Sequence, residues 1–379
     1  MNLVTLPRKI AVGLPYFGKE LRSLVSDRTA FFIAKPRVVH IWRGAPCNGR
    51  CIMCQFGFAP AKEREALMHS EFTDEMMSQI LPQIAELCGR GTMISYMGGE
   101  PTLSPHLLDW VRTSCRLGLD FRFTTNGYRM TPQLANDVAA AGLFNIGVSL
   151  ESLNPEVNEA MRPVPNGTKL TVRAIELLIA ARRRLRARLS INVKTVISNL
   201  NMTDFLDIAR RWGKEEGVMI TPQSFEAQEG MPQATRDKLF IRDLSRLKVF
   251  AKQVRLLKQE GYNIHITEQG LEDMLRLCRE DQEHKSTMHN KALNMDPDAP
   301  PCNIATDNLW IQEGTVRICP YFPPLTNLIT DSTTLKQAWG SEKCAQIRDQ
   351  TRRCRRLCTV SCLRRTPLMH KVQTFLRIS

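Results

Sequence analysis

The sequence has no long apolar run and no segment of strongly biased composition. No stretch of its 379 residues reaches the roughly 20 apolar residues that cross a bilayer. The N-terminal segment carries Arg8, Lys9, Lys19 and Glu20, which interrupt the apolar stretch that a secretory signal needs. Charged residues make up 24% of the chain, and Gly and Pro are spread along it, which is typical of a globular protein. We therefore predict a cytoplasmic protein with one large domain and a smaller unit.

Acidic residues are too few to balance the basic ones. The chain has 38 Asp and Glu against 52 Lys and Arg, a formal charge of +14 that favours an anionic partner without identifying it. The densest basic run, residues 182–188, ends an expected helix, where cations suit the helix dipole and face solvent. No nucleic-acid-binding motif accompanies this run, which argues against a nucleic-acid partner.

Short β-rich runs alternate with amphipathic stretches from residue 38 onward, which predicts parallel βαβ units and the α/β class. The expected strands are Val38–Trp42, Met93–Met97, Phe121–Thr125, Asn145–Ser149, Leu189–Ile197 and Val218–Thr221. The expected helices are Thr73–Leu87, Pro105–Leu117, Pro132–Ala141, Leu170–Ala181 and Met202–Glu216. Six repeats are too few for a closed eight-fold barrel, so we predict a partial (β/α)6 TIM-like barrel. The loops after its strands should converge on one rim.

The chain divides at changes in this pattern. We expect an N-terminal extension over 1–37, a barrel core over 38–228 and a charged helical linker or cover over 229–300, which includes a helix over Arg242–Glu260. A small Cys-rich unit should follow over 301–365, beginning with a β-hairpin around Glu313 and Gly314, and a tail over 366–379.

The twelve cysteines are clustered, and a reducing cytoplasm makes metal binding the simplest explanation for such clusters. Cys47, Cys51 and Cys54 follow the first expected strand, and three thiolates in eight residues can hold three corners of an iron–sulfur cube. The fourth iron is then open for chemistry. Zinc fits less well, because the gaps are three and two residues and no His follows the three cysteines until His69. The isolated Cys88, Cys115 and Cys278 are expected to be small buried residues.

These three cysteines match the CxxxCxxC signature of the radical S-adenosylmethionine (radical SAM) superfamily, which this chain resembles. Gly98-Gly99-Glu100-Pro101, after the second strand, is similar to the family's GGEP motif. The resemblance implies that this motif holds the methionine amino group of the cofactor, and Gly permits the close approach that such a contact needs. Met53 stands where many relatives have an aromatic residue near the adenine.

Weaker resemblances follow at later strand ends. Asn126 lies in a Thr-Asn-Gly sequence after the third strand, and Ser149 and Glu151 follow the fourth; they are similar to family positions that contact the ribose and the carboxylate. Asn192, Lys194 and Asn199 belong to a run like the family's fifth-strand motif near the adenine and sulfonium. Turn formation by Asn-Gly and helix capping by Ser149 or Glu151 are alternative explanations.

The resemblance implies an enzyme with a 4Fe–4S cluster and S-adenosylmethionine. In the family, reductive cleavage of the cofactor gives a 5′-deoxyadenosyl radical that takes a hydrogen atom from substrate, while the protein orients the reactants. It also implies an electron donor such as flavodoxin or ferredoxin.

A second set of cysteines resembles the family's SPASM or twitch extension, which binds an auxiliary 4Fe–4S cluster. Cys302, Gly314 and Cys319 have its opening spacing, whereas the later gaps depart from a full SPASM domain. We expect one auxiliary cluster and an oxidation. Its expected ligands are Cys302, Cys319 and two of Cys354, Cys358 and Cys362, with Cys344 as a further candidate. A zinc site built from the same thiols remains an alternative.

The substrate and the reaction remain open at this point. Only some 37 residues precede the first strand, fewer than the about 80 of a leader-binding module, so we expect a small acidic or phosphorylated molecule or a short peptide. The alternatives are a peptide-modifying maturase and, in another class, a zinc-dependent basic nucleic-acid-binding protein. Gln223, Glu226 and Gln228, beyond the sixth strand, are candidates for the group that quenches the substrate radical.

Overall fold

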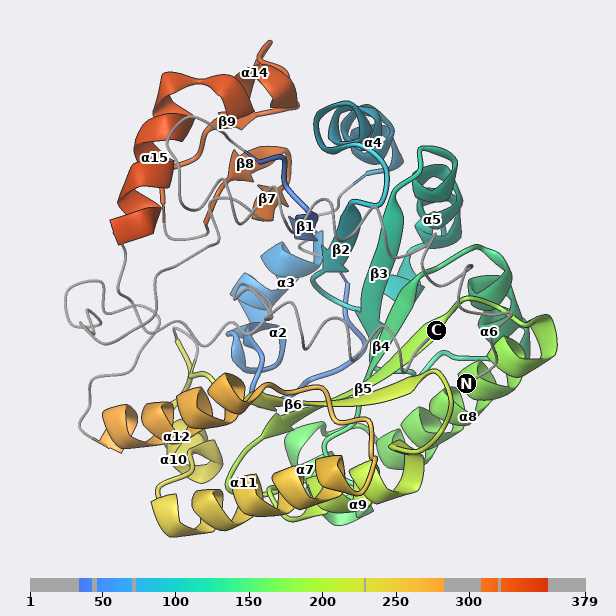
Figure 1. Ribbon diagram of the computed structural model, residues 1–379, viewed down its shortest axis with the longest axis vertical. Coiled ribbons are helices and arrows are strands. Elements are labelled where there is room, and N and C mark those ends of the chain that lie inside the picture. Colours follow the sequence, from blue (N-terminus) through green and yellow to red (C-terminus); the bar gives the residue numbers. More distant parts are fainter. Residues whose placement is uncertain are drawn as a thin grey trace.

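The computed structural model describes residues 34–42, 46–69, 73–227, 230–282, 308–319 and 322–353. Its centre is a nine-stranded sheet in the order β6-β5-β4-β3-β2-β1-β7-β8-β9. Strands β1 to β6 pair in parallel with their neighbours, as expected for βαβ units. They span Val38–Trp42, Met93–Met97, Asp120–Thr125, Asn145–Ser149, Ser190–Ile197 and Val218–Ser224. The partial barrel is confirmed, because the sheet curves without closing (Figure 1).

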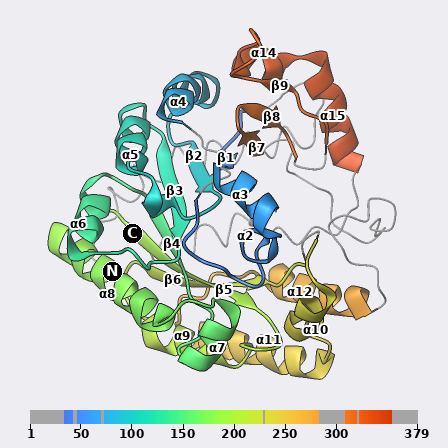
Figure 2. The same ribbon diagram turned by 180° about the vertical axis from the view of Figure 1, so that it is seen from behind.

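Most helices cover the outer side of this sheet, whereas the first two, α2 and α3, lie on its inner side, as Figures 1 and 2 show from opposite directions. The helices that follow strands β1 to β5 are α2 (Gln55–Phe58), α3 (Ala61–His69), α4 (Asp74–Cys88), α5 (Leu107–Arg116), α6 (Pro132–Ala140), α7 (Pro155–Met161), α8 (Gly167–Leu185) and α9 (Asp204–Trp212). Local chemistry sets their ends. The Thr73 side chain accepts the Met76 amide at the start of α4, and Gly89, at a φ of 73°, ends that helix.

The main apolar core lies between the helices and the outward face of the sheet. Val39, Ile41, Phe121 and Phe123 alternate along β1 and β3 and are at most 2% exposed. Residues at the alternate positions face the interior of the barrel. The sheet therefore separates an apolar outer layer from an inner surface that is available for a site.

The charged segment after β6 forms three helices along that edge: α10 (Gln233–Leu239), α11 (Leu244–Gln259) and α12 (Glu268–Gln282). The helix expected over 242–260 is confirmed as α11. Phe250 of α11 packs against Phe205 of α9 with ring centroids 5.6 Å apart, and Ile264 bridges to Ile220 of β6. These helices therefore extend the outer layer of the barrel.

The hairpin expected around Glu313 and Gly314 is present as β7 (Asn308–Gln312) and β8 (Thr315–Arg317). Both turn residues have positive φ values, 49° and 82°. The sequence did not indicate that β7 also pairs in parallel with β1 and so extends the barrel sheet. After β9 (Thr326–Asn327), helix α14 (Leu335–Gly340) packs on α4, and α15 (Glu342–Arg353) follows (Figure 1).

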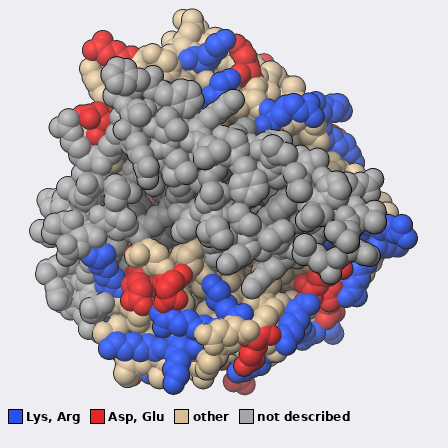
Figure 3. All heavy atoms as spheres, viewed as in Figure 1, with Lys and Arg blue, Asp and Glu red and all other residues tan. Residues whose placement is uncertain are grey.

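The basic run differs from its expected solvent-only environment. Arg182 donates to the Leu189 carbonyl and pairs with Glu216, and Arg183 pairs with Glu215. Along the lower edge in Figure 3, acidic and basic side chains are intermixed. Arg255 of α11 bridges two glutamates of α12, Glu268 and Glu272. Within the described ranges, every helix is too short or too polar to cross a bilayer.

Candidate active site at the carboxyl ends of the strands

Three free thiols lie in the loop between β1 and α2. The Gly49 amide donates to Cys47 Sγ at 3.4 Å, and a Cβ at Gly49 would lie 3.7 Å from both Cys47 Sγ and Cys51 Sγ. Cys54 immediately precedes α2, and the amides of Phe56 and Gly57 donate to its sulfur. Backbone N–H groups aimed at sulfur suit thiolates that ligate a metal centre.

Burial raises the pKa of Cys47 to about 12 and that of Cys54 to about 11. Both thiols therefore keep their protons until a metal displaces them.

The arrangement fits a multi-iron cluster better than a single ion. Tetrahedral zinc with Zn–S bonds of about 2.3 Å needs its sulfur ligands about 3.8 Å apart. Among the described residues, no three His, Cys, Asp or Glu side chains converge in this way. The three thiols are therefore not arranged around one tetrahedral ion in this structure.

Gly98 and Gly99 shape the loop after β2. Their φ values of 96° and 49° lie in the left-handed region, which explains the need for Gly. The Glu100 amide donates to the Pro46 carbonyl at 3.0 Å, which ties this loop to the cysteine loop. Pro101 then begins a short 3-10 turn over Pro101–Leu103.

The Glu100 side chain is 2% exposed and is held by protein donors. Its Oε1 accepts from the Thr102 amide, the Thr102 hydroxyl and the Thr125 hydroxyl, and its Oε2 accepts from the Asn126 amide at 2.7 Å. Burial raises the pKa of Glu100, against the effect of these donors. The carboxyl group therefore joins the loops after β2 and β3, and the backbone of Gly98 and Gly99 is the part of the motif best suited to meet a cofactor.

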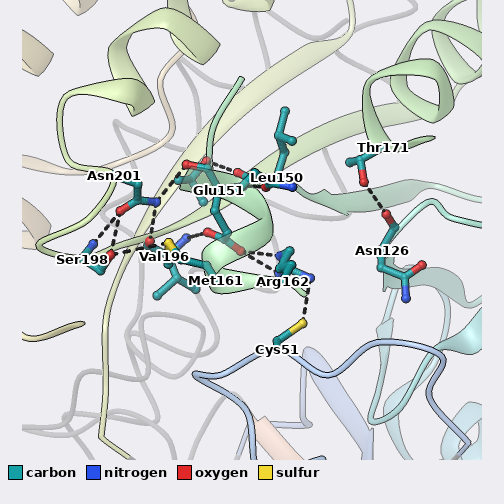
Figure 4. Close-up of polar contacts among 12 residues, drawn as sticks. Cys51, Asn126, Leu150, Glu151, Met161, Arg162, Thr171, Val196, Ser198 and Asn201 are labelled. Carbon is teal, nitrogen blue, oxygen red and sulfur yellow. Dashed lines mark hydrogen bonds and ion pairs between the residues drawn. The ribbon is translucent and has the colours of Figure 1, made fainter. Parts of the chain in front are cut away.

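Asn126 connects the third strand end to the cysteine loop. Its Nδ2 donates to Asn48 Oδ1 at 2.7 Å, and its carbonyl accepts from the Thr171 hydroxyl at 2.8 Å (Figure 4). Gly127 follows with a φ of 79°, and a Cβ there would lie 2.8 Å from Ala174 Cβ. The Asn-Gly pair therefore forms a turn, and its Asn126 side chain also connects this turn to the cysteine loop.

The fourth strand end supplies a buried ion pair that reaches Cys51. Arg162, which follows α7, donates from Nε to Glu151 Oε1 at 2.8 Å and from Nη1 to Cys51 Sγ at 3.3 Å (Figure 4). Glu151 Oε2 accepts the Val196 amide at 2.7 Å. The negative charges near it raise the pKa of Arg162, against the effect of burial. The sequence did not indicate Arg162, because only the fold brings it to Cys51.

The remaining expected residues lie on or beside the inner face of the sheet. Asn192 Oδ1 accepts the Thr221 hydroxyl at 2.8 Å, and Lys194 Nζ donates to Thr124 Oγ1 at 3.0 Å. Ser149 stands beside Lys194 in the strand register. Met53 is buried in a small apolar cluster next to the cysteine loop, together with Met161, Phe225 and Leu239.

Gln223 and Glu226 lie at the end of β6, on the same rim, and Gln228 is outside the described residues. Burial raises the pKa of Glu226 to about 7. This carboxyl group can therefore exchange a proton near neutral pH.

The second cysteine cluster is only partly described. Cys319 is buried just after β8, whereas Cys302, Cys354, Cys358 and Cys362 lie outside the described residues. Cys344 is fully buried in the apolar core, and burial raises its pKa to about 11. This environment suits a packing residue.

Comparisons with known proteins agree with this geometry. Residues 44–211 match the family model of the radical SAM superfamily. The chain is 22% identical over 262 residues to an AdoMet-dependent heme synthase of Methanosarcina barkeri, a match covering 64% of this chain and 71% of that protein. It is 26% identical over 170 residues to the mycofactocin maturase MftC of Mycobacterium tuberculosis, covering 44% and 40%.

The fold also resembles that of Streptococcus suis SuiB. In a crystal structure bound to its precursor peptide SuiA, the TM-score is 0.60 at 14% identity, covering 86% of this chain and 70% of that one. SuiB bound to S-adenosylmethionine gives a TM-score of 0.58.

The partial barrel and the cysteine loop at its rim define a radical SAM domain. The chain is accordingly an enzyme with a radical SAM domain over residues 44–211, and such domains use a 4Fe–4S cluster and S-adenosylmethionine.

Proposed function

We propose that this enzyme abstracts a hydrogen atom from an acidic small molecule or short peptide and that the net reaction is an oxidation. When bound, the cluster and cofactor supply the electron and the 5′-deoxyadenosyl radical that this requires. The observation that carries the proposal is the meeting of the cysteine loop with the loops after β2, β3 and β4 through Glu100, Asn126 and Arg162.

Different residues of the chain bind the cluster and the cofactor. Cys47, Cys51 and Cys54 hold three irons, and Arg162 fixes the position of Cys51 by donating to its sulfur. The Gly98 and Gly99 backbone receives the methionine amino group, and Met53 gives the adenine an apolar surface.

An auxiliary cluster would accept an electron in the oxidation. We propose that Cys319 contributes to it, together with Cys302 and two of Cys354, Cys358 and Cys362. Cys319 follows the β7–β8 hairpin, and β7 pairs with β1, which leads into the cysteine loop. This pairing supports a second redox centre close to the first.

The second candidate function is peptide maturation. It is favoured by the similarity to the maturase MftC and by the likeness of the fold to SuiB, which was crystallised with a precursor peptide. Modification of a short peptide encoded beside this gene, seen as a mass change after anaerobic turnover, would select this candidate over a small-molecule oxidation.

The test of the proposal is cofactor cleavage. Anaerobically reconstituted protein, supplied with dithionite and S-adenosylmethionine, should form 5′-deoxyadenosine, measured by liquid chromatography and mass spectrometry. The triple replacement Cys47→Ala, Cys51→Ala and Cys54→Ala should abolish it while the absorbance of the auxiliary cluster remains. Cys115→Ala is the matched control, because this thiol contacts the Gly142 carbonyl away from the site. Cleavage that survives in the triple variant would show that the site is wrong.

A further inference from the structure

The guanidinium group of Arg162 lies between a carboxylate and a cysteine sulfur (Figure 4). On one side, Nη1 donates to Cys51 Sγ at 3.3 Å. On the other side, Nε donates to Glu151 Oε1 at 2.8 Å, and Nη2 lies 2.6 Å from the same oxygen. The positive charge of Arg162 is therefore in direct contact with a sulfur that is expected to bind iron.

The carboxylate that holds Arg162 is itself fixed by buried groups. Glu151 Oε2 accepts the Val196 amide at 2.7 Å, which ties the side chain to β5. The Glu151 amide donates to Asn158 Oδ1 at 3.0 Å, and both residues are fully buried. The guanidinium therefore has little freedom to move away from the sulfur.

The backbone of the cysteine loop is attached to α7 without the help of this side chain. The Ile52 amide donates to the Met161 carbonyl at 3.0 Å, and the Cys54 amide donates to the Cys51 carbonyl at 3.0 Å. These main-chain hydrogen bonds set the path of the loop beside Arg162. A replacement of Arg162 therefore removes the contact with the sulfur and leaves these bonds in place.

Stability of the fold does not explain why an ion pair is buried here. The side chains of Arg162 and Glu151 are 11% and 0% exposed. Moving two charges out of water costs about as much as their attraction returns, and apolar groups of similar volume are often as stable. An arginine also keeps its charge at any physiological pH. The pair therefore places a permanent positive charge beside Cys51.

A positive charge at this place favours a cluster that carries more negative charge. Reduction adds one electron to the cluster that Cys51 would help to bind. Net charge, hydrogen bonds to the sulfurs and solvent exposure set the reduction potentials of iron–sulfur clusters. Because the pair is nearly fully buried, water screens its charges only weakly. Glu151 offsets part of the effect, but the guanidinium lies between it and the sulfur (Figure 4).

We propose that Arg162 is a positioning residue that makes reduction of the cluster more favourable by donating to Cys51 Sγ, and that Glu151 limits this effect. The inference rests on the proposed function, because it requires Cys51 to bind the cluster. One electron passes from the external donor to the cluster, and no bond forms or breaks in this step. The two side chains should therefore shift the reduction potential in opposite directions.

The test is a potentiometric titration of the anaerobically reconstituted full chain without S-adenosylmethionine, followed by electron paramagnetic resonance. The signal that is absent from the triple cysteine variant belongs to this cluster. The double replacement Arg162→Met and Glu151→Gln removes the contact with the sulfur and leaves no unpaired buried charge. It should make reduction about tenfold less favourable, a midpoint about 59 mV more negative for one electron.

Glu151→Gln alone should shift the midpoint to a more positive value, because the guanidinium charge is then uncompensated. A residue that only maintained the structure would not produce shifts of opposite sign. If the double variant binds no cluster, the shift in Glu151→Gln decides the question. Arg211→Met is the matched control, because it breaks an exposed pair with Glu176 and should keep the wild-type midpoint.

The proposal is overturned if the double variant has the midpoint of the control, or if Glu151→Gln does not shift the midpoint to a more positive value. Formation of 5′-deoxyadenosine by the wild-type preparation is scored separately. Cofactor cleavage with unchanged midpoints refutes only this inference. A wild-type cluster that is reduced but never cleaves the cofactor refutes the proposed function.

Discussion

Replacing Arg162 with Met should destabilise the protein by far more than loss of a surface ion pair. The Glu151 side chain is 0% exposed and that of Arg162 is 11% exposed. Without the guanidinium, Glu151 keeps the Val196 amide as a donor but becomes an uncompensated buried charge. Removing one partner of such a pair costs about 3–5 kcal/mol.

The measurement is urea unfolding of the cluster-free full chain under anaerobic, reducing conditions. Adding Glu151→Gln to Arg162→Met should restore most of the lost stability, because no buried charge then remains. The control is Arg211→Met, which breaks an exposed pair with Glu176 and should cost less than about 1 kcal/mol. If Arg162→Met costs no more than this control, or if the double variant is as unstable as Arg162→Met alone, the reasoning is refuted.

Three further replacements have distinct expected outcomes. Because folding raises the pKa of Glu226 from 4.5 to about 7, wild-type stability should fall relative to Glu226→Gln as pH rises from about 5 to about 7; parallel urea midpoints across that window would contradict this. Gly127→Ala should lower the free energy of unfolding by about 2–4 kcal/mol, because of backbone strain and the contact with Ala174. The control Gly89→Ala, which has open space around the added Cβ, should lower it by only about 1 kcal/mol. Equal losses in thermal unfolding would contradict the effect of the Ala174 contact. Cys344→Ala should lower the melting temperature and leave iron and sulfide content unchanged, whereas a loss of iron would make this residue a ligand.

The strands were predictable because each carries a strong local signal. The runs over β1, β2 and β4 were predicted with their observed bounds, and β6 extends three residues beyond the expected Thr221. The parallel pairing of β7 with β1 was not predictable, because it joins residues about 270 positions apart and local periodicity carries no information about such contacts.

The candidate site was likewise predictable where local sequence carried the signal and not where the fold brought distant residues together. The cysteine spacing and the Gly98–Pro101 sequence indicated the class of chemistry. Arg162 carried no recognisable signal, since its meaning depends on α7 placing it between Glu151 and Cys51. The hydrogen bonds by which Glu100 joins the loops after β2 and β3 were not predictable either, because they depend on the fold.

The central claim is that three thiolates leave one iron open to the cofactor. Electron–nuclear double resonance of the reduced cluster tests it most directly, using S-adenosylmethionine labelled with ¹⁵N at the amino group and ¹⁷O at the carboxylate. We predict magnetic coupling of both labels to the cluster, which requires direct coordination. A cluster whose spectrum does not change when the cofactor is added, with no coupling to either label, would contradict the account.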